Sequence, residues 1–369
     1  MPRVAGESGV VECLADSARL AALSLSQWDR LLRLARASNL MGRLLQVIDA
    51  AGPALRLPPE VEPHLQAVRV LTSHQREAVV WECNRIAQAI SGLGTPLLLL
   101  KGAAYVMADL PAAHGRLFGD IDLLVQRTQI DEVERVLRLH GWFMGQVSAY
   151  DEDYYRRWMH ELPPMTHALR HTSIDVHHNI LPPSSGHAPD PSVLLALSVP
   201  IPGTVFRRLC DEDMVIHSAS HLFHEGEVRH ALRDLYDLDA LLRGFSLREG
   251  FWDRLLARAR QLRLEWCCHL ALRYSRAILG TPVPDAVCAA AARQSGVGSL
   301  RQMLLDAVYR RAFRAQHPEF AGPSDRAAAR YLYVRSHALR MPPHLLLAHL
   351  TRKAWTRAFT TTSVRIGAG

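Results

Sequence analysis

Two short acidic segments carry the residues best suited to hold a divalent metal ion. In the first, Gly119-Asp-Ile-Asp-Leu-Leu-Val125, Asp120 and Asp122 alternate with an apolar residue. Successive side chains of a strand point to opposite faces, so both carboxylates project from the same face. Two carboxylates this close repel each other unless a cation lies between them. A hard divalent ion with oxygen ligands is the natural occupant.

A third carboxylate, Asp175, lies in the segment Ser173–His177 and shares a face with His177. If this strand lies beside the Asp120 strand, three carboxylates meet at one point. Such a cluster supports two metal ions ~3.5–4 Å apart, the arrangement used for in-line displacement at phosphorus. We therefore predict Asp120, Asp122 and Asp175 as metal ligands and catalytic residues, with two Mg²⁺ ions and His177 in an accessory role.

A phosphate-binding turn is expected at Lys101-Gly102, directly after the apolar run Leu97–Leu100. Glycine lets the backbone approach a phosphate closely at the positive end of a helix. Only Lys101 and Lys353 are lysine, against 41 arginines, so a lysine here suits a role that needs a compact ammonium group. Arg116 adds a guanidinium that can pair bidentately with phosphate. We predict that Lys101, Gly102 and Arg116 bind phosphate.

The elements that position these residues alternate between strand and helix. This alternation predicts a mixed α+β protein, with a small α/β sheet core flanked by N-terminal and C-terminal helical regions. The three regions are predicted at residues 1–91, 92–200 and 201–369. Strands are expected at 97–100, 121–125, 143–149 and 173–177, with helices at 103–110 and 130–140. Later helices are expected at approximately 211–224, 228–243, 250–279, 284–293, 299–315 and 324–358.

Composition narrows the class of partner. The net charge of +7 and pI near 9.3 suit an anionic ligand. The chain has no dense Lys/Arg run and no interleaving of basic and aromatic residues, so a nucleic-acid partner is not expected. The six scattered cysteines include no CxxC pair, which indicates reduced thiols. With no signal peptide and no apolar run near the ~20 residues that span a bilayer, we expect a cytoplasmic protein.

Three short sequence motifs resemble those of a known family. Leu100-Lys-Gly102, Arg116-x-x-Gly-Asp-Ile-Asp-Leu-Leu-Val125 and Ile174-Asp-Val-His177 look like those of a bacterial group of uncharacterised nucleotidyltransferases. That group belongs to the superfamily of DNA polymerase β and the kanamycin-type antibiotic nucleotidyltransferases. The resemblance covers roughly residues 80 to 245, where Arg233-Asp-Leu-Tyr-Asp237 also looks like the group.

The resemblance implies Mg²⁺-dependent transfer of a nucleoside monophosphate (NMP) group from a nucleoside triphosphate (NTP). The acceptor would be a hydroxyl of a small molecule, peptide or protein. Asp120 and Asp122 would hold the ions that bridge the phosphates, and Asp175 would complete the metal site and help to deprotonate the acceptor. Lys101-Gly102 departs from the family's usual Gly-Ser turn. Eighteen positions separate Gly102 from Asp120, which is longer than usual.

Several alternatives stay open at this point. His217 and His221 are spaced to share one helix face, but zinc would need a third ligand. We favour a helix that covers the metal site, with Arg233 and Asp237 contacting base, acceptor or core. The basic amphipathic stretch 342–359 suits either a membrane surface or, as we prefer, its own domain. The main alternative function is a non-catalytic nucleotide-binding or partner module that retains the fold.

Overall fold

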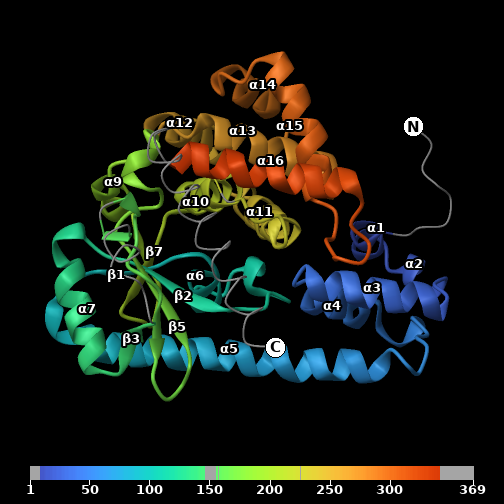
Figure 1. The fold of residues 1–369 in the computed structure, drawn as a ribbon, viewed down its shortest axis with the longest axis horizontal. Helices are drawn as coiled ribbons and strands as arrows, with labels where there is room; N and C mark the ends of the chain where they lie inside the picture. The colour runs from blue at the N-terminus through green and yellow to red at the C-terminus, as the bar shows by residue number, and fades with distance from the viewer. Residues whose placement is uncertain (1–8, 146–154, 157, 225, 341–369) are drawn as a thin grey trace, which may run out of the picture.

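The computed structural model describes residues 9–145, 155–156, 158–224 and 226–340 (Figure 1). The mixed α+β class is confirmed: helices surround one seven-stranded mixed sheet. The N-terminal helices are α1 (Val10–Ala15), α2 (Ala18–Ala21), α3 (Leu25–Ala37), α4 (Met41–Ala51) and α5 (Glu62–Ile90).

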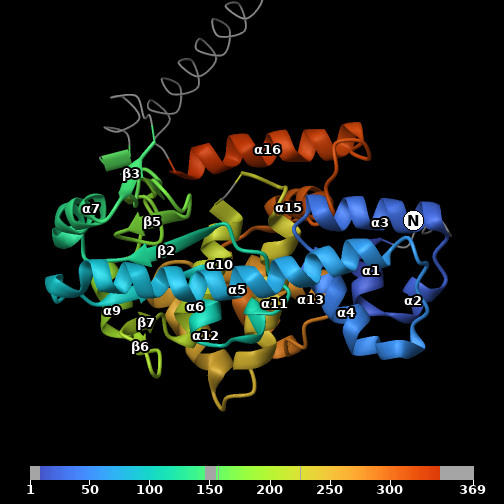
Figure 2. The ribbon, with the colours of Figure 1, turned by 90° about the horizontal axis from the view of Figure 1, so that it is seen from below.

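Helix α3 shows how local sequence sets these elements. The Ser24 hydroxyl accepts from the backbone N–H of Gln27, and the Gln27 side chain accepts from the backbone N–H of Ser24. This capping box fixes the start of the helix. Buried side chains then recur at helical spacing, so one face packs into the core. The long helix α5 runs along the whole molecule, from α4 at one end to α7 (Ile130–Leu139) at the other (Figure 2).

The sheet has the strand order β3-β4-β5-β2-β1-β7-β6. β2 pairs in parallel with β5 and antiparallel with β1, while β1 pairs in parallel with β7. The three residues of β1 are all buried leucines, as expected of a central strand covered on both faces. The strands are β1 (Leu97–Leu99), β2 (Asp120–Leu124), β3 (Trp142–Met144), β4 (Met165–His167), β5 (Ser173–His177), β6 (Val199–Pro200) and β7 (Phe206–Arg208).

The structure refines the predicted elements within the sheet. The strand expected at 143–149 is β3, and residues 146–149 lie outside the described part of the chain. The helix after Leu100 is α6 (Lys101–Met107), which ends three residues before Leu110. Strands β4, β6 and β7 were not predicted. The sheet runs past residue 200 through β7, and the division into three regions stays a prediction.

The C-terminal helices lie on the side of the sheet opposite α5 (Figure 1). The single helix predicted at 250–279 is wrong. Arg263 adopts a φ of 59°, a left-handed conformation that ends an α-helix. Leu262 and Leu264 stay buried beside it, so the apolar pattern continues through the break. The helices are α9 (Pro191–Ala196), α10 (Asp211–His224), α11 (Ala231–Phe245), α12 (Phe251–Gln261), α13 (Glu265–Leu279), α14 (Asp285–Gln294), α15 (Ser299–Ala312) and α16 (Pro323–Arg340).

Two sequence-based expectations meet the structure here. All six cysteines lie in the described part of the chain, and each is a free thiol. Among the described residues, no helix has the length and apolar character needed to cross a membrane. The stretch 342–359, for which membrane contact was considered, lies outside the described residues.

Candidate functional site

Asp122 and Asp175 lie side by side at the centre of the sheet. They are register partners on the parallel strands β2 and β5, so both side chains project from one face. Oxygen atoms of these two carboxylates and a ring nitrogen of His177 all lie within 4.8 Å of one another. Asp175 Oδ1 is buried and has no hydrogen-bond partner within the described residues. A buried carboxylate oxygen without a donor is one that a cation would satisfy.

Asp120 occupies the open end of the same strand. Its side chain is exposed, and its register partner on β5 is Ser173. Asp120 is absent from the two close groups of potential metal ligands found among the described residues. Although the residue as a whole is exposed, the surrounding protein desolvates its carboxylate. This desolvation and then the negative charge of Asp122 raise the pKa of Asp120, so the two carboxylates are near enough to repel. The role of Asp120 as a metal ligand therefore stays a prediction.

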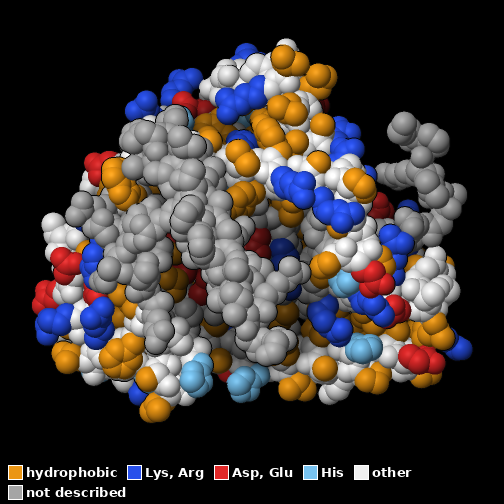
Figure 3. Space-filling model, viewed as in Figure 1, with side chains coloured by type: hydrophobic (Ala, Val, Ile, Leu, Met, Phe, Trp, Pro, Cys, Tyr) orange, Lys and Arg blue, Asp and Glu red, His pale blue; other side chains and the backbone are white. Residues whose placement is uncertain are grey.

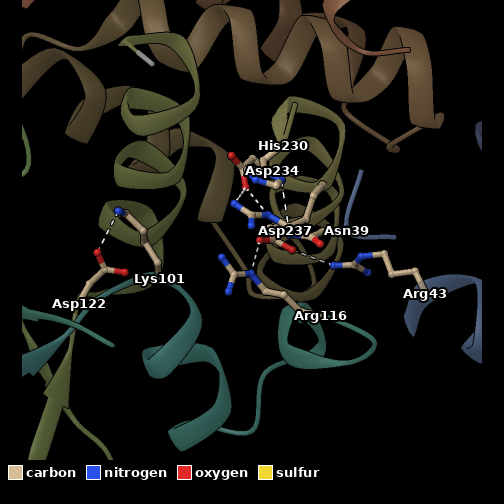
Figure 4. A network of polar contacts seen from close by, with 9 residues as sticks. Asn39, Arg43, Lys101, Arg116, Asp122, His230, Asp234 and Asp237 are labelled. Carbon is tan, nitrogen blue, oxygen red and sulfur yellow. Dashed lines mark hydrogen bonds and ion pairs between the residues drawn. The ribbon is translucent and has the colours of Figure 1, made fainter. Parts of the chain in front are cut away.

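Lys101 faces Asp122 across the start of α6. Its backbone has a φ of 41°, the left-handed region that non-glycine residues enter at a cost of about 1–3 kcal/mol. The Lys101 Nζ donates to Asp122 Oδ1 at 3.0 Å (Figure 4). Burial by itself would raise the pKa of Asp122, but Lys101 and His177 outweigh burial and hold this pKa well below its ordinary value. Asp122 is therefore an ionised, paired carboxylate.

Asp175 has the opposite electrostatic character. Burial, followed by repulsion from Asp122 and Glu161, raises the pKa of Asp175 to about 7. No lysine or arginine of the described residues forms an ion pair with it. Positive charge thus lies closer to Asp122 than to Asp175. Asp122 therefore ionises readily, whereas Asp175 resists ionisation.

Sequence reasoning missed a neighbouring group, His160 and Glu161. His177 Nε2 lies 3.0 Å from Asp122 Oδ1, while His177 Nδ1 lies 3.1 Å from Glu161 Oε2. Burial would lower the pKa of His177, but Glu161 and Asp122 raise it. The residues before β5 contained no strand signal, so nothing in the local pattern placed Glu161 beside β5. We name Asp120, Asp122, Asp175 and Glu161, with Lys101 and His177, the carboxylate cluster.

Helix α10 brings two histidines toward this cluster. Burial and the charge of Lys101 lower the pKa of His217 to about 3, and the same causes hold the pKa of His221 well below its ordinary value. Both imidazoles are therefore neutral near pH 7. Neither histidine joins a close group of potential metal ligands among the described residues. That α10 covers the site stays a prediction.

A second set of charges lies at the other side of α6. Asp237 of α11 accepts from Arg43 Nη2 at 2.9 Å and from Arg116 Nε at 2.7 Å (Figure 4). Arg233 pairs with its neighbour Asp234 at 2.6 Å. We name Arg43, Arg116 and Asp237 the Asp237 network. It joins α4, the segment before β2 and α11, so the predicted accessory residue Asp237 binds arginines of the fold.

Gly102 lies directly under the Arg116 guanidinium. A Cβ atom added at Gly102 would lie 2.2 Å from Arg116 Nη1 and 2.9 Å from the Phe118 ring. The space that was predicted to admit a phosphate is thus next to a guanidinium that Asp237 already holds. Lys101, Gly102 and Arg116 do lie close together, and their contact with a nucleotide stays a prediction.

Other surfaces offer less specific chemistry. On the face seen in Figure 3, Lys and Arg side chains are scattered among apolar and acidic ones instead of forming one stripe. A cavity of about 610 Å³ lies between α13, α14 and α15. Its Arg273 and Tyr274 bind Asp306, so these polar groups already satisfy one another. The carboxylate cluster remains the stronger candidate because its Asp175 oxygen is unsatisfied.

Comparison with known proteins adds one finding. The sequence model of a family described as uncharacterised nucleotidyltransferase matches residues 24–280. No curated protein and no solved structure matches the chain. The matched part runs from α3 to the end of α13, and so includes the carboxylate cluster and the Asp237 network. Because the match spans more than half of the 369 residues, this chain belongs to the uncharacterised nucleotidyltransferase family.

Proposed function

We propose that the protein transfers an NMP group from an NTP to a hydroxyl of a small-molecule, peptide or protein acceptor, with release of pyrophosphate. The observation that carries the proposal is the pairing of Asp122 with Asp175, whose buried Oδ1 has no hydrogen-bond partner among the residues that the structure describes. Membership of a nucleotidyltransferase family supports this reaction class. The order of D-x-D strand and third carboxylate strand also resembles the DNA polymerase β-like superfamily.

The carboxylates fit Mg²⁺, which prefers oxygen ligands. Asp120, Asp122 and Asp175 would hold two ions, which supply charge neutralisation for the phosphates and the leaving group. Lys101, Gly102 and Arg116 would bind the phosphates. Lys101 is already held over the site by Asp122, so its ammonium group is positioned before a nucleotide arrives. Positioning of this kind carries much of the catalysis in phosphoryl chemistry.

Asp175 also suits the acceptor side of the reaction. The acceptor oxygen must lose a proton as it attacks the α-phosphorus and the bond to pyrophosphate breaks. A carboxylate beside the acceptor hydroxyl would take up this proton. His217 and His221 on α10, both neutral, would help to exclude water from the reacting groups.

The test uses the full chain, each of the four NTPs labelled at the α-phosphate, Mg²⁺ and a panel of hydroxyl acceptors. We expect one or more labelled products whose mass exceeds that of the acceptor by one NMP group. Asp122→Asn should abolish the product. NTP binding that depends on Mg²⁺ but yields no product over the panel would favour the non-catalytic module. If neither binding nor product is seen, the proposal is wrong.

A further inference from the structure

The segment before β4 runs beside the end of β5. Glu161 and His177 form an antiparallel bridge, Leu162 N–H donates to Val176 O at 2.9 Å, and His178 N–H donates to His160 O at 2.7 Å. Directly opposed residues of an antiparallel pair point to the same face. The backbone therefore fixes the Glu161 carboxylate next to the His177 ring.

Three potential ligand atoms converge at this point. His177 Nδ1 lies 3.1 Å from Glu161 Oε2, and His160 Nε2 lies 3.9 Å from the same oxygen. All three side chains have ligand atoms within 4.8 Å of one another. Ligand atoms bound at about 2.1 Å to a tetrahedral ion are roughly 3.4 Å apart, and the two distances bracket this spacing.

The close approach of His177 to Glu161 is not a hydrogen bond. His177 is 97% buried, and its Nδ1 has no hydrogen-bond partner within the described part of the chain, because the ring direction misses the Glu161 oxygen. The buried imidazole nitrogen lies close to a carboxylate oxygen but makes no hydrogen bond to it. Two ligands that share a metal ion have this arrangement.

We propose that His160, Glu161 and His177 bind a borderline divalent transition-metal ion of the Zn²⁺ type, at a site next to the proposed Mg²⁺ ligands Asp122 and Asp175. Imidazole nitrogen favours such ions over Mg²⁺, which takes oxygen ligands. Three protein ligands leave a coordination position open. The Glu161 side chain is 20% exposed, so one ligand of the site contacts solvent.

Through the His177 ring, the ion would be connected to Asp122. With the metal on Nδ1, the remaining ring proton sits on Nε2, which lies 3.0 Å from Asp122 Oδ1 and donates to it. Metal-bound histidines commonly donate their other ring N–H to a carboxylate, which fixes the tautomer and the ring orientation. Asp122 would thus be the outer partner of this metal site.

Co²⁺ is the probe, since its visible absorption reports imidazole ligation, and Zn²⁺ competition gives the affinity. The full-length wild-type chain, without nucleotide, should bind one Co²⁺ with an absorption band that Zn²⁺ displaces. Glu161→Gln and His160→Ala should each weaken binding at least about 100-fold, beyond the effect of losing an outer partner. The near-isosteric Glu161→Gln serves if His160→Ala does not fold, as judged by circular dichroism.

Two controls locate the ion. His74→Ala removes an exposed histidine of α5 and should leave the band unchanged. Asp175→Asn should also keep the band, because Asp175 belongs only to the other group of potential ligands that shares His177. A band that survives Glu161→Gln or disappears in Asp175→Asn would overturn the proposal, as would wild type that binds no Co²⁺. These readouts do not depend on nucleotidyl transfer.

Discussion

The carboxylate cluster and the Asp237 network lie on either side of α6, and they use charge differently. In the Asp237 network one carboxylate accepts from two arginines, and its side chain is 3% exposed. In the carboxylate cluster Lys101 and His177 both approach Asp122, while Asp175 has an unsatisfied oxygen. In the first set the carboxylate is paired with two arginines, although Arg43 Nε has no hydrogen-bond partner among the described residues. In the second set negative charge is left over.

This difference separates a stabilising role from a functional one. Removing one member of a buried, satisfied ion pair strands the other charge and destabilises the fold. Unsatisfied carboxylates repel each other, so they lower stability until a ligand arrives. The electrostatics therefore make Asp237 an organiser of three chain segments, and they support the proposal that Asp175 binds a cation.

The largest expected effect is on catalysis by Asp175→Asn. We expect Mg²⁺-dependent NMP transfer to fall at least about 10³-fold, the scale of losing a group that acts at the transition state. Thermal unfolding without Mg²⁺ should show unchanged or higher stability, because a repelling charge is removed. Asp131→Asn, an exposed carboxylate on α7, is the matched control. Equal loss of activity in both variants would contradict the assignment.

The Asp237 network should respond in the opposite way. Asp237→Ala leaves Arg43 and Arg116 without their shared carboxylate, and we expect the free energy of unfolding to fall by about 3–5 kcal/mol. Denaturant titration measures it. The control Asp29→Ala removes an exposed partner of Arg33 and should cost about 1 kcal/mol or less. Similar losses of unfolding free energy in the two variants would contradict the stabilising role proposed for Asp237.

Gly102→Ala tests the contact between the two regions. The added Cβ must displace the Arg116 guanidinium, so we expect a loss of about 1–3 kcal/mol in stability from overpacking. Gly244→Ala in α11 adds a methyl group in open space and should not destabilise. If Gly102→Ala is as stable as wild type, the Arg116 guanidinium moves aside at no cost, and the Asp237 network does not hold it rigidly.

The smallest expected effect is the pH dependence of Mg²⁺ binding. The folded pKa of Asp175, about 7, is raised above its ordinary value, so its ionisation costs stability as pH rises toward 7 and the cost is complete above that pH. Because Mg²⁺ needs the ionised form, its affinity should rise up to about tenfold per pH unit below pH 7 and level off above. Calorimetric titrations from pH 5.5 to 8 should show this slope in wild type. An equal slope in Asp175→Asn would assign it to another group.

Local sequence determined the short-range features of this protein. The strand pleat placed Asp120 and Asp122 on one face, and β2 and β5 formed within one residue of the predicted limits. Helical spacing predicted α10 at the observed residues. These predictions worked because a backbone conformation and an alternation of side chains depend on neighbours within a few positions.

Only the tertiary structure decided which charges meet. Sequence spacing did not pair Lys101 with Asp122, Arg116 with Asp237, or Glu161 with His177, since these contacts span 16 to 121 positions. They arise because β5 pairs with β2 on one side and with the segment before β4 on the other, while α11 packs against the turn Pro111–Ala113, shortly before Arg116. The two register partners thus differ through their surroundings: Lys101 makes Asp122 a paired anion, whereas Asp175 keeps a buried oxygen that has no hydrogen-bond partner among the described residues.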